Sequence, residues 1–233
     1  YYVSASFRTD GSSRFHPDNR WGKFWSIGGS WRISNEDFMS STSEWLDNLK
    51  IKASYGAVGN DNLGTYYAYQ GLYATGLNNY NNAGVMISRL PNRNLKWETN
   101  LQTNVGVDFA MFNRLSGSFE WFSRKSKDLL FYMPMAPSTG FSGIDRNIGD
   151  VKNVGVEFSL NFAAINTKDF KWTIDLNGTH YKNTITKLPQ KEINSGVFKW
   201  REGESRYNFW GPEYAGVNPE TGNDMYWMNV YAT

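Results

Sequence analysis

The sequence predicts an all-β chain, and three observations support this class. Apolar and polar residues alternate with period 2 in several segments, which is the pattern of a strand with one apolar and one polar face. These segments are about 10–14 residues long in several cases, whereas most globular strands run ~3–10 residues. The connections between them alternate between short and long. Together these features favour an antiparallel sheet of long strands.

The alternation starts at the first residue and recurs along the chain. In one segment, for example, Val105, Val107 and Phe109 alternate with Asn104 and Asp108. No comparable segment shows a helical period. The predicted strands cover residues 1–8, 49–57, 101–111, 154–163 and 170–177. Because the chain opens within the first of these strands, we expect it to be a section of a longer protein.

The strand length fits a membrane as well as water, since a tilted transmembrane strand needs ~9–11 residues. In a water-soluble sandwich the polar face meets the solvent. In an outer-membrane barrel the apolar face meets lipid and the polar face lines the lumen. The strand pattern alone leaves both architectures open.

The composition sets further limits. Among 233 residues, 17% are aromatic and none is cysteine, yet the mean hydropathy is -0.58. So many aromatic residues exclude intrinsic disorder. No run approaches the ~20 apolar residues of a spanning helix, and no secretory signal is recognisable. A net charge of +2 gives no basic field, so nucleic acid is not an expected partner.

The connections favour the barrel. Residues 112–115 and 165–169 form short links, whereas 58–96, 134–150 and 185–206 are long and rich in Gly, Asn, Ser and Pro. Such alternation is typical of a barrel with short periplasmic turns and long extracellular loops. A two-residue turn at 113–114 would place Phe109 opposite Ser118 and mismatch the faces. A three-residue loop at 113–115 or at 112–114 restores the match, with Asn113 supplying a left-handed residue.

One connection is an exception, because residues 34–48 are long although they follow a strand that runs toward the short-turn end. We expect an ordered turn here, with a capping box at Ser34-Asn35-Glu36-Asp37 and with Phe38, Trp45 and Leu46 as hydrophobic staples.

Aromatic residues also gather near the predicted strand ends, as in the girdles of membrane barrels. Aromatic pairs across strands of a soluble sheet are the alternative.

Several motifs, in this order, resemble those of one family. They are Arg8-Thr9-Asp10-Gly11-Ser12-Ser13-Arg14-Phe15 with Asn19-Arg20-Trp21-Gly22 and Trp31-Arg32-Ile33, Leu49 to Gly56 with Gly59-Asn60, Asn94 to Thr99, Asn147 to Glu157, and Gly216 to Gly222. The chain is thereby similar, from residue 1 to about 227, to the barrel of SusC/RagA-type TonB-dependent outer-membrane transporters. A motif such as Asp10-Gly11-Ser12-Ser13 alone is generic turn chemistry, so the resemblance rests on the succession of motifs.

The resemblance implies that residues 1–233 supply roughly 8–10 strands of a 22-stranded barrel, as part of a single barrel domain. The signal peptide, N-terminal extension, plug and closing strands lie outside this sequence. It also implies import of glycan oligosaccharides or peptides across the outer membrane, with a SusD-like surface lipoprotein and the TonB-ExbB-ExbD complex as partners. No catalysis and no cofactor are expected. A secreted carbohydrate-binding β-sandwich remains the alternative.

Two groups of candidate functional residues follow. Polar side chains on the strands are expected to face the lumen or the plug: Lys50, Lys52, Asn104, Asp108, Glu120, Glu157 and Asp175. Asp108 and Glu120 would be directly opposed in the 113–115 register. A glycosidase needs two carboxylates ~5–10 Å apart, but we expect these groups to meet lysine or arginine on neighbouring strands or on the plug.

The second group lies in the long loops and suits stacking on sugars or capture of peptides: Tyr66, Tyr67, Tyr69, Tyr73, Asn78, Asn79, Tyr80, Trp200, Arg201, Tyr207 and Trp210. Alternatively these residues anchor the loops or contact a partner protein. No metal site is expected, because His16 and His180 lack a second histidine at ligand spacing. Oxygen-rich loops at 60–62 and 218–224 could suit calcium, but ordinary loop hydrogen bonding is the expectation.

Overall fold

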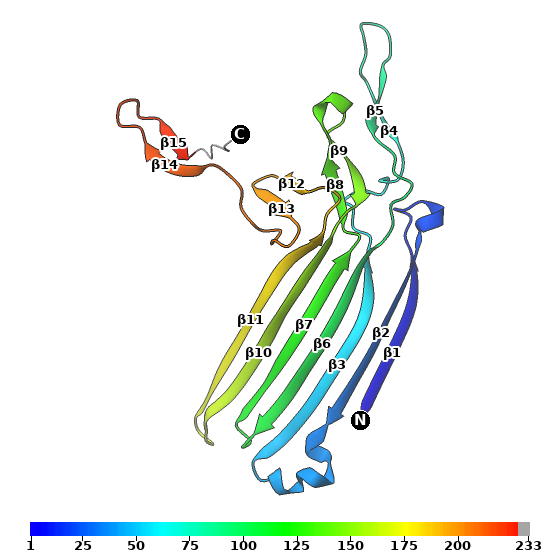
Figure 1. The fold of residues 1–233 in the computed structure, drawn as a ribbon. Helices are drawn as coiled ribbons and strands as arrows, with labels where there is room; N and C mark the ends of the chain where they lie inside the picture. The colour runs from blue at the N-terminus through cyan, green and yellow to red at the C-terminus, as the bar shows by residue number, and fades with distance from the viewer. Residues whose placement is uncertain (228–233) are drawn as a thin grey trace.

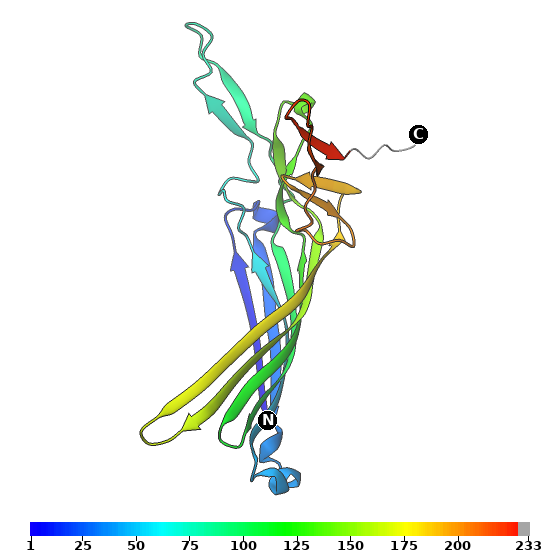
Figure 2. The same cartoon turned by 90° about the vertical axis from the view of Figure 1, so that its left-hand side faces the viewer.

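The computed structural model describes residues 1–227, and its main body is one antiparallel sheet of seven long strands in the order β1-β2-β3-β6-β7-β10-β11 (Figure 1). This confirms the all-β antiparallel prediction. Figure 2 shows the sheet from the side as a single twisted layer. Its strands are β1 (Tyr2–Gly11), β2 (Trp21–Arg32), β3 (Leu46–Asn60), β6 (Glu98–Met111), β7 (Leu115–Lys127), β10 (Asp150–Asn166) and β11 (Lys171–Lys187).

The pairing register decides between the two loops proposed between β6 and β7. Met111 pairs with Leu115, so the loop is 112–114, and Val107 lies opposite Phe119. Phe112 and Asn113 both adopt left-handed backbone angles, with φ of 57° and 53°. The prediction for Asn113 is confirmed. The 113–115 alternative is wrong, because Phe109 pairs with Gly117 and not with Phe119, a register two residues away from the one that this loop requires.

The short-turn end of the sheet also carries the chain terminus at Tyr1 and the long connection between β2 and β3 (Figure 1). This connection contains two 3₁₀ helices, η2 (Ile33–Asn35) and η3 (Asp37–Thr42). The ordered turn is confirmed, but the capping box is wrong. Ser34, the first residue of that box, lies inside η2, and its buried Oγ has no hydrogen bond within residues 1–227. The Glu36 carboxylate accepts from Trp31 Nε1 at 2.8 Å.

The opposite end of the sheet carries the long loops, which form short two-stranded hairpins (Figure 1). The expected 8–10 wall strands are therefore seven, since residues 188–227 build hairpins at the loop end and no further strand of the sheet. The hairpins are β4 (Leu72–Thr75) with β5 (Val85–Arg89), β8 (Leu130–Pro134) with β9 (Gly143–Asn147), β12 (Glu192–Ser195) with β13 (Phe198–Arg201), and β14 (Glu213–Val217) with β15 (Asp224–Trp227).

Buried apolar side chains form two small clusters at the loop end, and the sheet itself has no covered core within residues 1–227. The first cluster joins Phe15, Ala68 and Leu95, close to the 3₁₀ helix η1 (Pro17–Asn19). The second joins the turn before β10, the strands β10 and β11, and the hairpin β12–β13: Ile148, Val151, Ile185, Ile193 and Trp200. A further 3₁₀ helix, η4 (Pro137–Thr139), lies between β8 and β9. No helix in the described chain is long and apolar enough to cross a bilayer.

Candidate functional site

One face of the sheet presents large apolar side chains that nothing else in residues 1–227 covers. Ile51, Phe119 and Phe158 lie in one row across the sheet, with Val107 between the first two. Their exposed fractions are 43%, 47% and 44%. A water-soluble sheet buries such a face under a second layer, and none is present in the described chain. This face therefore requires apolar surroundings.

The opposite face carries the polar residues, and all seven strand candidates from the sequence lie on it. The register places Lys50 opposite Asp108, and Lys52 in the same row as Gly106, Glu120 and Glu157. On the neighbouring rows of the same face lie Asn104, opposite Ser54, and Asp175, opposite Asn161. The sheet thus has one mainly apolar face and one mainly polar face.

Lys52 is the centre of an ion-pair network on the polar face. Its Nζ lies 3.0 Å from Asp108 Oδ1 and 3.3 Å from Glu120 Oε2, while Lys50 Nζ lies 3.4 Å from Asp108 Oδ2. Asp108 itself faces Ser118, so Asp108 and Glu120 are not directly opposed as the 113–115 register would have them. The expected pairing with lysines of a neighbouring strand is present. A carboxylate pair held by a shared lysine does not offer the free acid and base of a glycosidase.

Glu120 and Glu157 lie directly opposite each other on β7 and β10. Like charges in this position are destabilising, by roughly 0.2–1 kcal/mol in magnitude. Lys52 relieves only the Glu120 side of the pair within the described chain. Within the described chain, Glu157 therefore keeps a negative charge on the polar face, next to a row of serine and asparagine side chains.

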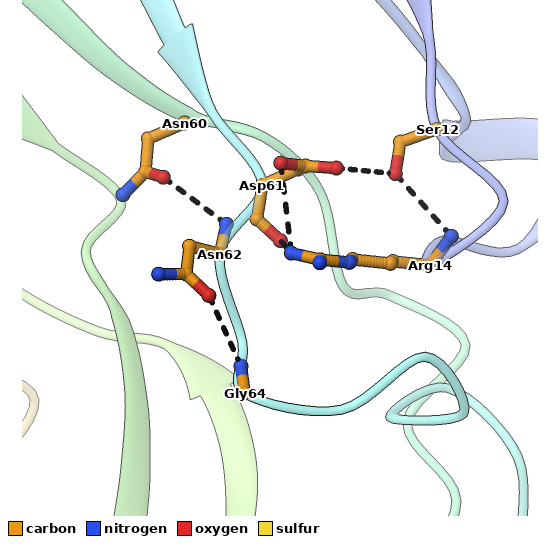
Figure 3. A network of polar contacts seen from close by, with 6 residues as sticks. All are labelled: Ser12, Arg14, Asn60, Asp61, Asn62 and Gly64. Atoms are coloured by element: carbon orange, nitrogen blue, oxygen red, sulfur yellow. Dashed lines mark hydrogen bonds and ion pairs between the residues drawn. The ribbon is translucent and has the colours of Figure 1, made fainter.

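A polar network at the loop end joins two loops that are far apart in the sequence (Figure 3). Asp61 Oδ2 accepts from Ser12 Oγ at 2.7 Å, and the Asp61 backbone oxygen accepts from Arg14 Nη1 at 3.0 Å. The Arg14 guanidinium also lies 4.7 Å from the centre of the Tyr66 ring. The loop after β1 and the loop after β3 are thereby held as one unit.

The side-chain oxygens of residues 60–62, which could have suited calcium, accept hydrogen bonds within the loops instead. Asn60 Oδ1 accepts from the Asn62 backbone N–H, and Asn62 Oδ1 accepts from that of Gly64 (Figure 3). Asp61 is occupied by Ser12 and Arg14. These are Asx turns, which short loops commonly use. Within residues 1–227 no three histidine, aspartate or glutamate side chains gather closely enough to hold a metal ion.

The tyrosines of this loop differ in exposure. Tyr66 and Tyr67 are exposed by 64% and 56%. Tyr69 is half-buried and packs edge-on against His16, with ring centres 5.9 Å apart. Beneath them Phe15 and Leu95 are completely buried. The loop thus presents two exposed tyrosines on a fixed base.

Hairpin β4–β5 projects furthest from the sheet (Figure 1). Tyr73 and Tyr80 are exposed by 65% and 92%, and Asn79 forms a bridge with Asn82 at the tip. The base of the hairpin contacts β9 through Arg89, whose Nη2 lies 3.1 Å from Asp145 Oδ2. The exposed asparagine Asn78 lies beside these residues.

Asp145 is almost completely buried. Burial raises the pKa of its carboxyl above the ordinary aspartate value, and the Arg89 guanidinium offsets only part of this rise. Oδ2 has no aligned hydrogen bond, so its contact with Arg89 is electrostatic. The pair joins hairpins β4–β5 and β8–β9 across 56 residues of sequence, and nothing in the local pattern around either residue predicts it.

Among the candidate residues in and after hairpin β12–β13, Trp200 is buried, whereas Tyr207 and Trp210 are exposed. Trp200 is only 8% exposed and donates from Nε1 to the Arg206 backbone oxygen at 3.0 Å, so it anchors the hairpin. Trp210 is 48% exposed, and Lys199 Nζ lies 3.7 Å from its ring centre. Tyr207 is also exposed. The Lys199 ammonium group thus holds the exposed Trp210 ring in place.

Arg201 belongs to a small ion-pair cluster on the same hairpin. Its Nε lies 3.1 Å from Glu192 Oε2, and Lys199 Nζ lies 3.0 Å from Glu192 Oε1. Hydrogen bonds from Lys199 and Arg201 lower the pKa of the Glu192 carboxyl. Sequence reasoning missed the role of Lys199 and Arg14, because each contacts its aromatic ring only after the loops have folded.

This architecture is similar to that of known proteins. The family model "TonB dependent receptor-like, beta-barrel" matches residues 1–232. TonB-dependent receptor P3 of Formosa agariphila is 36% identical over 232 residues, which cover 93% of this chain and 23% of that protein. TonB-dependent receptor SusC of Bacteroides thetaiotaomicron is 38% identical over 198 residues, covering 81% of this chain and 19% of SusC.

The solved structures agree. The RagAB peptide importer in its closed-closed state matches 100% of this chain and 26% of its own, with a TM-score of 0.88 and 32% identity. Its open-open state gives a TM-score of 0.84 over 98% of this chain. The chain spans about a fifth to a quarter of the length of the curated relatives it matches.

The fold is thus shared with the RagAB importer structures over nearly the whole chain. The resemblance to SusC/RagA-type transporters that the motifs indicated is confirmed, and this is a family of transporters and not of enzymes. The chain belongs to the TonB-dependent receptor family, as part of its outer-membrane β-barrel.

Proposed function

We propose that residues 1–233 form a section of the wall of a single barrel domain in an outer-membrane TonB-dependent importer. The observation that carries this proposal is the seven-stranded sheet, with one face apolar and uncovered and the other polar and joined by ion pairs. In the bilayer the apolar face contacts lipid, and the polar face lines the lumen and contacts a plug. The plug, the N-terminal extension and the closing strands belong to other parts of the same protein.

The wall gives the transporter a fixed frame and carries out no covalent step. The ion pairs of Lys50 and Lys52 with Asp108 and Glu120 lock three neighbouring strands in register. A plug can then move against this face without distorting the barrel. The force comes from the TonB-ExbB-ExbD complex, which acts through the plug and not through these strands.

The loop end is the side on which nutrient is captured. Exposed aromatic residues at Tyr66, Tyr67, Tyr73, Tyr80, Tyr207 and Trp210 lie in the same loops as the amides of Asn78 and Asn79 and the guanidinium of Arg201. Such groups stack on sugar rings or on peptide side chains and hydrogen-bond their polar edges. Trp200 supports this surface from below. A SusD-like lipoprotein covers it, and the cargo is an oligosaccharide or a peptide.

Spin labels test the orientation of the wall in the full-length protein reconstituted in lipid. Labels at Val105, Val156 and Ile174 are expected to be quenched by a lipid-soluble relaxation agent. Labels at Asn104, Glu157 and Asp175 are expected to respond to a water-soluble agent or to be shielded by the plug. The reverse pattern overturns the proposed function.

A further inference from the structure

The apolar face of the wall ends, toward the loops, in a group of four lysines. This lysine band consists of Lys125 and Lys127 on β7, Lys152 on β10 and Lys182 on β11. The register places these residues on the same face as Trp121, Val156 and Phe158. They lie on the outside of the wall, and the capture surface described above does not include them.

The lysines lie close to one another across three neighbouring strands. Lys152 pairs directly with Lys125 on β7 and with Thr184 on β11. Lys182 pairs with Val154, so it is the diagonal neighbour of Lys152 on the same face. Directly opposite residues lie ~5 Å apart and diagonal ones ~7–8 Å apart. The band therefore brings several ammonium groups within reach of a single ligand.

Few carboxylates neutralise this charge. Lys125 Nζ lies 3.5 Å from Asp150 Oδ2. Within residues 1–227, Lys127, Lys152 and Lys182 have no carboxylate within 4.0 Å. Opposed like charges such as Lys125 and Lys152 destabilise a sheet. An external anion bound between them would remove this repulsion.

The height of the band along the wall identifies the surroundings in which it lies. Ten residues separate Phe162 from Lys152 on β10, which corresponds to ~33 Å along the strand at ~3.3 Å per residue. With a strand tilt of ~40°, this is about 25 Å along the membrane normal, the height of the apolar band of an outer-membrane barrel. With Phe162 and Trp172 at one edge of the bilayer, Lys152 lies at the headgroup level of the other edge, on the side of the loops.

We propose that the lysine band binds the phosphate groups of a phosphorylated lipid in the outer leaflet. The charges are complementary, and the site is continuous with the lipid-contacting face, so the acyl chains of the same lipid lie on Val154, Val156 and Phe158. Lysine holds phosphate as a point charge and needs no fixed geometry. The inference rests on the orientation given under the proposed function.

The test measures lipid binding by the full-length protein in detergent, by native mass spectrometry, with bisphosphoryl lipid A as the probe. We expect wild-type protein to bind this lipid more tightly than its dephosphorylated form. The variant K125Q/K152Q/K182Q is expected to bind it roughly tenfold to a hundredfold more weakly. Asp150→Asn removes the carboxylate that pairs with Lys125 and is expected to tighten binding.

The control K168Q/K171Q/K191Q removes the same charge from exposed positions outside the band and is expected to bind as wild type does. The retarded gel migration of unheated, folded barrel confirms folding of each variant.

Equal binding by both triple variants overturns the inference. So does equal binding of phosphorylated and dephosphorylated lipid, or of inorganic phosphate as tightly as lipid. If the spin labels of the previous section report the reverse orientation, the proposed function fails as well. If they report the proposed orientation, only the lipid site fails.

Discussion

Replacing Lys52 by methionine tests whether the ion-pair network locks the strands of the wall. Lys52 Nζ lies within 3.3 Å of carboxylate oxygens on two different strands, Asp108 on β6 and Glu120 on β7. The three side chains are 28–35% exposed, so each pair is partly screened and contributes at most ~1 kcal/mol. Loss of both pairs, together with the unrelieved repulsion between Glu120 and Glu157, gives about 2 kcal/mol.

The assay is guanidinium unfolding of the full-length protein in detergent, followed by tryptophan fluorescence. Lys52→Met is expected to lower the free energy of unfolding by about 2 kcal/mol, and Lys171→Met, at an exposed position without an ion pair, by less than ~0.5 kcal/mol. A double-mutant cycle with Glu120→Gln is expected to give a coupling of ~0.5–1 kcal/mol. No coupling, or equal effects of Lys52→Met and Lys171→Met, refutes the network as a lock.

Three further predictions concern the turns and loops. Asn113→Val, at a φ of 53°, is expected to destabilise the protein by ~1–2 kcal/mol and Asn113→Gly to be neutral or stabilising, as the same unfolding assay would show. Burial raises the pKa of Asp145, so the folded state binds its proton more tightly than the unfolded state does. Docking of β8–β9 should therefore be strongest below pH 3.8 and weaken as the pH rises through the raised pKa, and hydrogen exchange in these strands measures this change. Trp200→Ala is expected to loosen β12–β13 by ~3–5 kcal/mol, whereas Trp210→Ala weakens cargo binding with a stability loss below ~1 kcal/mol.

Each of these predictions has a contradicting result. Equal stability of the valine and glycine variants would show that the turn at Asn113 tolerates other backbone angles. Asp145→Asn should abolish the pH dependence of exchange, and its persistence would assign that dependence to another group. Limited proteolysis of residues 188–212 should accelerate in Trp200→Ala only. Equal acceleration in Trp210→Ala would contradict the separation into anchor and contact residue.

Much of the wall could be predicted from the residues alone, because the period of a strand is local. Alternation such as Val105, Val107 and Phe109 against Asn104 and Asp108 assigns every residue to a face without knowledge of its neighbours. The length of the runs and the alternation of short and long links then indicate a membrane barrel. The predicted faces of all seven polar strand candidates agree with the register.

The loops could not be predicted in the same way, because their contacts join residues that are distant in sequence. Trp200 and Trp210 lie only ten residues apart in one loop region, yet Trp200 is buried against Phe131 and Trp210 is exposed. The Arg14–Asp61 and Arg89–Asp145 contacts span 47 and 56 residues. Glu36 looked like part of a capping box but binds Trp31 instead.

The residues alone are enough to show that this protein is an all-β wall with an apolar and a polar side, because side chains alternate along any extended strand whatever that strand pairs with. The 112–114 loop, the seven strands of the sheet within residues 1–227, the sharing of Lys52 by Asp108 and Glu120, and the lysine band became known only from the folded structure. Each of these depends on the register between strands, and register is set by the sum of many pairings along two strands and not by either strand alone.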